Sequence, residues 1–263
     1  MTAIDDEAGL VSWRHGGEGI AVVTINRPQR RNALNLEVKE RLADAVGKLG
    51  ADKSVRVIVL TGAGSYFVAG TDIAEMATMT PTQHGALKTD RVFTVLRECP
   101  KILIAAVEGY ALGGGCELAL ACDMIVAGAG AKFGQPEIRV GIMPGAGATQ
   151  RLVRVMGRYR AMKLILTGEA VIAGDALAMG MLTEVVEDGQ ALARSLELAG
   201  TVASMPQLSV AAIKEVVRLG QDVPLETALA LERKAFLLLF DSADQKEGMQ
   251  AFLQKRSPVW KNA

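Results

Sequence analysis

The sequence predicts an α/β protein whose chain ends in a helical region, and three observations support this prediction. Half of the 263 residues are apolar, which is enough for a large buried core. Strand-like apolar runs alternate with stretches of helical apolar spacing up to about residue 205. Beyond that point only helical spacing remains. We therefore divide the chain into a core, residues 1–205, and a C-terminal helical region, residues 206–263.

The first elements predicted are a β-hairpin, a helix and a buried strand. Residues 10–13 and 20–26 are rich in strand-forming residues and flank the turn-prone residues 15–19, which predicts the hairpin. Asn35 precedes a stretch with apolar residues at helical spacing, which predicts an amphipathic helix. Residues 55–60, VRVIVL, predict a buried strand.

The middle of the chain predicts further strands and helices in close succession. Thr80 is a typical N-cap and Pro81 suits a first helical turn, so we expect a helix that runs to about Glu98. A strand, a glycine turn, a short helix and another strand are expected at residues 102–107, 109–115, 116–121 and 124–127. Pairs of strands for each helix favour a spiral of ββα units over a doubly wound sheet.

The C-terminal region predicts three helices, at residues 208–219, 225–240 and 243–252, with Ser242 as the cap of the last one. Residues 235–240, AFLLLF, are too apolar for a single buried face. We expect the middle helix to be buried on several sides, by the core of its own chain and by neighbouring subunits.

The composition argues against several classes of protein. Lys and Arg balance Asp and Glu at 29 each, so no long-range field attracts nucleic acid or anionic lipid. The three cysteines match no zinc spacing, and we expect no metal site and reduced thiols in a cytoplasmic compartment. Residues 1–10 are acidic and resemble neither a signal peptide nor a transit peptide. Glu117 and Asp123 interrupt the most apolar stretch, which argues against a membrane span.

Two glycine-bearing segments are candidates for a ligand site: residues 67–73, FVAGTDI, and residues 109–118, GYALGGGCEL. Small residues let a ligand approach the backbone, whose N–H groups can then face an oxygen that gains negative charge. Either segment alone is equally compatible with glycines that only make tight turns. Gly62-Ala63-Gly64 lacks the third glycine of a dinucleotide fingerprint, and no GxxxxGK[ST] loop occurs, which disfavours nicotinamide and nucleoside triphosphate enzymes.

Two glutamates are candidates for acid–base chemistry. Glu117 lies in the apolar helix segment GGGCELALAC, where a charge is costly unless it has partners or a function. Glu137 lies in the loop-like segment FGQPEI, and a single glutamate in a surface loop is usually solvated. His15 and His84 fall in no motif, and we predict that both are surface residues.

Five segments together resemble the crotonase superfamily of enoyl-CoA hydratases and isomerases. They are RPQRRNALN, FVAGTDIAEM, EGYALGGGCELALACD, FGQPEIRVGIMPGAGATQRL and AFLQKRSPVWK, in the family's order from about residue 19 to residue 261. The resemblance implies a crotonase-type spiral of ββα units. It also implies that the C-terminal helical region serves trimerisation, commonly as a dimer of trimers.

The resemblance also implies the roles of the candidate residues. The backbone N–H groups of Thr71 and Gly114 would form an oxyanion hole for a thioester oxygen, although many relatives carry alanine where this chain has Thr71. Glu117 would activate water and Glu137 would deliver a proton. Neither a metal nor a redox cofactor is implied, because coenzyme A is part of the substrate.

Contacts to coenzyme A and the acyl group are implied at residues that match the family's motifs. Gln29 stands where some hydratases carry a lysine near the phosphates, and Arg30 or Arg31 would substitute for it. Lys255, alongside Phe252, matches a lysine that reaches the coenzyme A of a neighbouring subunit, with a solvated helix end as the alternative. The expected contacts are Ala69, Gly70, Asp72, Ile73, Arg30, Phe252 and Lys255.

The expected activity is syn addition of water to a trans-2-enoyl-CoA, giving a 3-hydroxyacyl-CoA in fatty-acid β-oxidation or in phenylacetate-type aromatic degradation. A Δ3,Δ2-enoyl-CoA isomerase of the same fold is the alternative, although the presence of both glutamates favours a hydratase. A non-enzymatic RNA-binding relative is disfavoured by the zero net charge. The length and distal group of the acyl chain are left open, and we expect residues 76–85 and the following helix to line its pocket.

Overall fold

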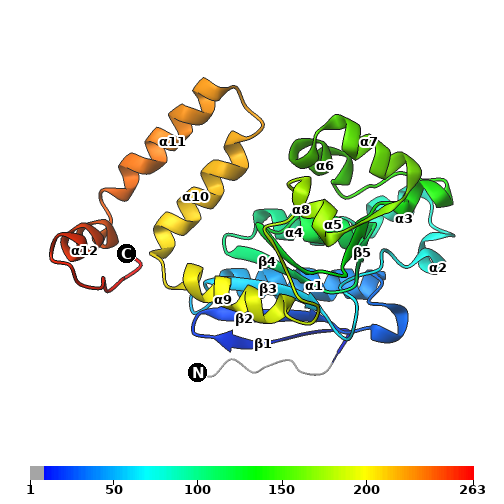
Figure 1. Cartoon of the computed structure of the whole chain (residues 1–263), viewed down its shortest axis with the longest axis horizontal. Coiled ribbons are helices and arrows are strands. Elements are labelled where there is room, and N and C mark those ends of the chain that lie inside the picture. The colour runs from blue at the N-terminus through cyan, green and yellow to red at the C-terminus, as the bar shows by residue number, and fades with distance from the viewer. Residues whose placement is uncertain (1–8) are drawn as a thin grey trace.

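The computed structural model describes residues 9–263 and has a six-stranded sheet with helices on both faces (Figure 1). The strand order is β1-β2-β3-β4-β6-β9, antiparallel between β1 and β2 and parallel elsewhere. These strands are β1 (Val11–Gly17), β2 (Ile20–Ile25), β3 (Val57–Gly62), β4 (Ile102–Val107), β6 (Met124–Gly128) and β9 (Glu184–Val186). The N-terminal hairpin is therefore confirmed, whereas the acidic residues 5–7 lie outside the described part of the chain.

The central strands are apolar on both faces because each face packs against a different helix layer. Ile58 and Leu60 of β3 belong to a core shared with α1 (Leu36–Ala51) and α4 (Arg91–Glu98). Val57 and Val59 point the other way and pack with α9 (Ala191–Ala203).

A second, three-stranded sheet contains β5 (Tyr110–Leu112), β7 (Lys132–Gly134) and β8 (Ala170–Ile172). The segment expected to be one glycine turn therefore contains a strand, and its helix α5 (Gly114–Leu120) begins earlier than predicted. A strand of three residues is too short for alternation to reveal it. The succession β4, β5, α5 is a ββα unit, as the resemblance implied.

Helix α1 forms where the sequence predicts it, because its cap and its apolar stripe agree. The Asn35 side chain accepts a hydrogen bond from the Val38 N–H at 3.0 Å and caps the helix. Val38, Leu42 and Val46 are buried at helical spacing.

The helix predicted from Pro81 to Glu98 is wrong in its middle. Thr80 caps α3 (Pro81–Ala86) in a capping box with Gln83, but the chain leaves the helical path before α4 begins at Arg91. Lys88 has a left-handed φ of 45° in this break. Helix α3 buries no residue, so no packing holds the two helices in one continuous rod.

The remaining helices fall into two groups, one that packs around the core and one that forms the C-terminal region. The first group is α2 (Ile73–Met76), α6 (Ala148–Met156), α7 (Arg158–Thr167) and α8 (Ala173–Ala178), with 3₁₀ turns at η1 (Pro28–Arg30) and η2 (Pro136–Val140). The second group is α10 (Gln207–Gly220), α11 (Leu225–Leu239) and α12 (Ala243–Leu253), and Ser242 caps α12 as predicted.

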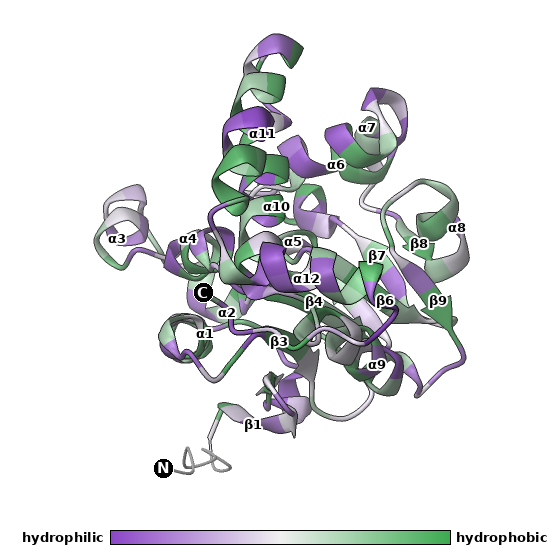
Figure 2. Ribbon diagram, turned by 90° about the vertical axis from the view of Figure 1, so that its left-hand side faces the viewer, coloured by the Kyte–Doolittle hydropathy of each residue, from purple (hydrophilic) through white to green (hydrophobic). Residues whose placement is uncertain are grey.

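Helices α10 and α11 form a hairpin that projects from the sheet, and apolar residues interrupt the polar ones along it (Figures 1 and 2). The expectation that the chain's own core buries α11 is wrong, because α11 buries no residue within this chain and Leu238 is 72% exposed. Within residues 9–263 no single helix is long and apolar enough to cross a membrane; α9 and α10 pass that test only jointly, across a 110° bend.

Candidate active site

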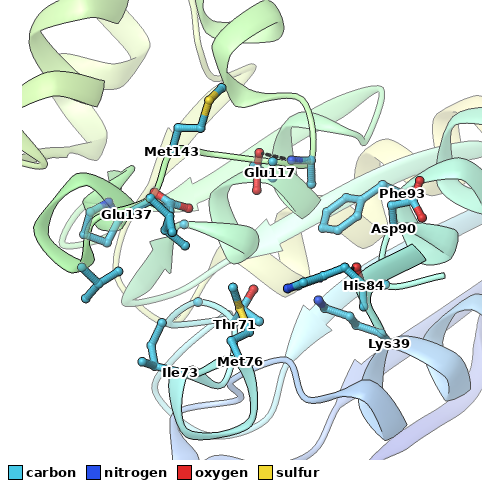
Figure 3. Close-up of a pocket in the computed structure, with 18 of the residues that line it drawn as sticks. Lys39, Thr71, Ile73, Met76, His84, Asp90, Phe93, Glu117, Glu137 and Met143 are labelled. Carbon is cyan, nitrogen blue, oxygen red and sulfur yellow. Dashed lines mark hydrogen bonds between the residues drawn. The ribbon is translucent and has the colours of Figure 1, made fainter. Parts of the chain in front are cut away.

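A cavity of about 470 Å³ brings together residues that are far apart in the sequence. Thr71 comes from the loop before α2, Glu117 from α5 and Glu137 from η2, and all three line the cavity (Figure 3). The two glutamates predicted from the sequence thus face the same cavity, and Thr71 of the first glycine-bearing segment faces it as well.

Glu117 is held at a fixed place by backbone donors. Every residue of α5 is buried, and Glu117 itself is 3% exposed. Its Oε1 accepts hydrogen bonds from the N–H groups of Ala146 at 2.7 Å and Ala148 at 3.1 Å. Burial raises the pKa of Glu117, while these two donors and the charge of Lys39 oppose that rise.

The pKa of the Glu137 carboxyl is raised as well. Burial raises the pKa of Glu137 to about 7, and the charge of Glu117 contributes to the rise. The fully buried Gln135, with its amide NH2 turned toward the carboxylate, donates to Oε1 at 3.0 Å and to Oε2 at 3.1 Å. A carboxyl group with a pKa near 7 can exchange a proton at neutral pH.

Gly113 makes room for the Glu137 carboxylate. A Cβ atom on Gly113 would lie 2.7 Å from Glu137 Oε1, closer than van der Waals contact allows. Gly113 also has a φ of 50°, which favours glycine. Neither Gln135 nor Gly113 was among the functional residues predicted from the sequence, although both lie within the motifs that resemble the family.

The backbone N–H groups of Thr71 and Gly114 lie beside each other and are free. Neither donates a hydrogen bond within residues 9–263, and the first residue of a helix has no acceptor inside that helix. A Cβ atom on Gly114 would lie 3.7 Å from the Thr71 nitrogen and 2.8 Å from Thr71 Oγ1. The absence of a side chain at Gly114 therefore keeps the space between the two donors open.

The loop that carries Thr71 is fixed to the segment that precedes α1. The Leu34 N–H donates to the Gly70 oxygen at 2.8 Å, and the Asp72 N–H donates to the Leu34 oxygen at 2.9 Å. Arg27 donates to Asp72 Oδ2 at 2.7 Å and holds the pKa of that carboxyl below its usual value. The position of the Thr71 amide is thus tied to α1.

The expected coenzyme A contacts fall into two groups in the structure. Ala69, Gly70 and Ile73 line the cavity. The other four do not line it within this chain: Asp72 caps α2 and pairs with Arg27, Arg30 is exposed in η1, Phe252 is 83% exposed and Lys255 is exposed after α12.

His15 is exposed as predicted, and His84 lies on α3, which buries no residue, but it was not expected to face the site. His84 is half-buried and lines the cavity, with its Nδ1 3.2 Å from Thr89 Oγ1. Met76 and Phe93, in the segment expected to line the pocket, also face it. Lys39 was missed because its position next to the apolar stripe of α1 predicts a solvent-facing residue.

Within residues 9–263 no group of three or more His, Cys, Asp and Glu side chains is arranged to hold a metal ion. The three cysteines are free thiols, and burial raises the pKa of each of them.

The fold and the site together are those of an enzyme class in which two carboxylates lie near a pair of free amide donors, an arrangement suited to an enolate intermediate. Comparison with known proteins specifies the family. Residues 15–263 match the family model described as enoyl-CoA hydratase/isomerase. The chain belongs to this family.

Relatives with similar sequences and structures are hydratases by name. The chain is 43% identical over 242 residues to the 2,3-dehydroadipyl-CoA hydratase of Escherichia coli, covering 92% of this chain and 95% of that one. It is 42% identical over 243 residues to the crotonyl-CoA hydratase of Syntrophomonas wolfei, covering 91% and 93%. A crystal structure of an enoyl-CoA hydratase from Bacillus anthracis matches with a TM-score of 0.93 at 34% identity, covering 97% and 100%.

Proposed function

We propose that this enzyme is an enoyl-CoA hydratase that adds water to a trans-2-enoyl-CoA and gives a 3-hydroxyacyl-CoA. The observation that carries the proposal is the convergence of Glu117 and Glu137 on the cavity that Thr71 also lines, with the free amide of Gly114 next to Thr71. The names of the similar proteins agree with it.

In the proposed mechanism the thioester oxygen accepts hydrogen bonds from the Thr71 and Gly114 amides. Glu117 accepts a proton from water while the water oxygen bonds to C3, and the electron pair of the double bond moves onto the thioester as an enolate. Protonated Glu137 then donates its proton to C2, and the proton on Glu117 returns to Glu137 before the next turnover. Glu137 suits the acid role because its pKa is raised to about 7.

We also infer that the enzyme acts as a trimer or a dimer of trimers. The support is the apolar surface that α10–α12 leave uncovered in one chain, which exceeds what single scattered residues would explain. The most exposed apolar residues of these helices are Ile213, Val217, Leu225, Leu238, Phe252 and Leu253. In such an assembly Phe252 and Lys255 of one subunit would contact the coenzyme A of another.

Two further features belong to the same proposal. The enzyme needs no metal or redox group, since the two carboxylates and two amides supply all the acid, base and charge stabilisation that hydration requires. Its compartment is the cytoplasm, where fatty-acid β-oxidation or aromatic degradation would provide the substrate.

The test is a spectrophotometric assay with crotonyl-CoA. Hydration removes the conjugated double bond, so the absorbance of the conjugated thioester decays. The isomerase alternative predicts the opposite signal from a 3-enoyl-CoA, whose conversion to the 2-enoyl isomer creates conjugation. No decay with crotonyl-CoA and a rise with the 3-enoyl thioester would replace the hydratase proposal by the isomerase.

A further inference from the structure

A half-buried lysine lines the cavity and has no partner among the described residues. Lys39 comes from α1, and its ammonium group forms no ion pair and no hydrogen bond within residues 9–263. Burial lowers the pKa of Lys39, against the opposing charges of Glu75, Glu117 and Asp90. An unpaired ammonium in a partly desolvated site is costly, and a lysine on a helix usually extends its amine to water instead.

The carboxylates near Lys39 are already engaged or solvated. Glu75 accepts a hydrogen bond from the Leu36 N–H at 2.8 Å. Glu117 Oε1 accepts from Ala146 and Ala148. Asp90 is exposed to solvent. The Lys39 amine is therefore available to an anion that enters the cavity.

His84 provides a second polar group at the same end of the cavity. Its Nδ1 is engaged with Thr89 Oγ1 at 3.2 Å, which leaves Nε2 for a ligand. In Figure 3 Lys39 and His84 point into the cavity on the side of Phe93, while Glu137 and Ile73 lie on the opposite side. The walls between these polar groups and the two glutamates are apolar, with Met76 and Phe93 among them.

The direction of the acyl chain follows from the proposed function, on which this inference rests. The thioester carbon lies at the Thr71 and Gly114 amides, C2 faces Glu137 and C3 faces Glu117. The chain beyond C3 therefore continues past Glu117 and away from Glu137, toward Phe93, His84 and Lys39 (Figure 3).

Space continues beyond Lys39. Lys39 and Thr89 also line a neighbouring cavity of about 190 Å³, whose other charged residues are Lys88, Arg91 and the exposed Glu40. Arg91 is paired with Asp44 at 2.6 Å, so Lys39 and Lys88 are the cations there that form no ion pair within residues 9–263. Apolar residues thus line the approach to this end of the site, and Lys39 and Lys88 lie there with no acidic partner among the described residues except the exposed Glu40, which pairs with neither of them.

We propose that the preferred substrate is an enoyl-CoA whose acyl chain ends in a carboxylate, and that Lys39, assisted by His84, binds this carboxylate. A neutral alkyl chain of the same length would leave the ammonium group without a partner in contact with apolar atoms. A terminal carboxylate forms a charge-assisted hydrogen bond with it and selects the tautomer of His84 that donates from Nε2.

The test compares two thioesters of equal length, trans-2-hexenoyl-CoA and the trans-2-hexenedioic monothioester of coenzyme A. We expect the wild-type kcat/KM to favour the acid by roughly 10- to 100-fold, as loss of a hydrogen bond to a charged group would predict. Lys39→Met, which keeps the length and removes the charge, should abolish this preference. Lys39→Arg should retain part of it.

Lys48→Met is the matched control, because Lys48 lies on the exposed side of the same helix and should leave the preference unchanged. Equal kcat/KM for the two thioesters in the wild type would overturn the inference. So would a Lys39→Met variant in which both values fall by the same factor, since Lys39 would then act through the charge of Glu117.

A second measurement separates this inference from the hydratase proposal. Calorimetry with the saturated thioesters adipyl-CoA and hexanoyl-CoA reports binding without turnover. Tighter binding of adipyl-CoA, lost in Lys39→Met, supports the inference even if crotonyl-CoA is not hydrated. Equal affinity together with crotonyl-CoA hydration overturns the inference alone.

Discussion

The two ends of the active-site cavity are built in different ways. At the catalytic end Glu117 lies in α5, all of whose residues are buried, and backbone N–H groups fix its carboxylate. At the acyl end His84 lies in α3, which buries no residue and is separated from α4 by a break in the helix. The difference indicates that the carboxylate of Glu117 is rigidly held, while His84, one of the two groups proposed to contact the substrate's tail, belongs to an element of low local stability.

The largest effect is expected at the rigid end, from Glu117→Gln. The amide cannot accept a proton from water, so kcat should fall by roughly 10²–10⁴-fold with little change in KM. Steady-state kinetics with crotonyl-CoA measure both values. Turnover close to the wild type would remove Glu117 from the mechanism.

Gly113→Ala should lower kcat by roughly 10- to 100-fold, because the new methyl group would displace the Glu137 carboxylate. Gly174→Ala in α8 is the control, since a Cβ atom there meets no other atom within 4 Å. Circular dichroism would establish that both variants fold. Equal kcat for the two variants would show that Glu137 tolerates displacement.

A smaller effect is expected in the pH profile. Hydration requires Glu137 in its protonated form, and its pKa is about 7, so kcat/KM should decline as pH rises through about 7. The Gln135 amide donates to the ionised carboxylate and favours it. Gln135→Leu should therefore raise the pKa of Glu137 and move the alkaline decline to higher pH. A decline that stays in place would mean that Gln135 has no influence on Glu137.

The smallest effect on chemistry is expected at the acyl end, from Thr80→Ala. Loss of this cap should cost about 1 kcal/mol of local stability in α3. Hydrogen exchange should accelerate in residues 81–86, and KM for a six-carbon substrate should rise more than KM for crotonyl-CoA. Ser242→Ala removes a similar cap from α12 and should change neither KM. A lower kcat for crotonyl-CoA in Thr80→Ala than in Ser242→Ala would show that α3 also influences the catalytic end.

The difference between the catalytic end and the acyl end of the cavity also explains which features the sequence could predict. Asn35, Thr80 and Ser242 cap helices through contacts within three residues, so local chemistry predicts them. Glu117 was identifiable because a charge within an apolar helix demands an explanation.

The acyl end could not be predicted in the same way. The break between α3 and α4 results from the absence of packing against α3, which local propensity does not report. Lys39 and His84 face the cavity only because residues 69–73, α1 and α3 meet there. Their spacing in the sequence is that of ordinary solvated side chains.

The hydrogen bonds between Leu34 and the loop around Thr71 have a consequence for chain-length selection. They join the loop that carries the free amide of Thr71 to Leu34, just before the N-cap of α1, and Lys39 lies in the first turn of that helix. The two groups proposed to bind the ends of the acyl portion, the Thr71 amide and Lys39, thus lie on two segments that are held together by backbone hydrogen bonds. The distance between these two groups therefore fixes the length of acyl chain that fits. A shorter or longer chain would not bring its terminal carboxylate to Lys39.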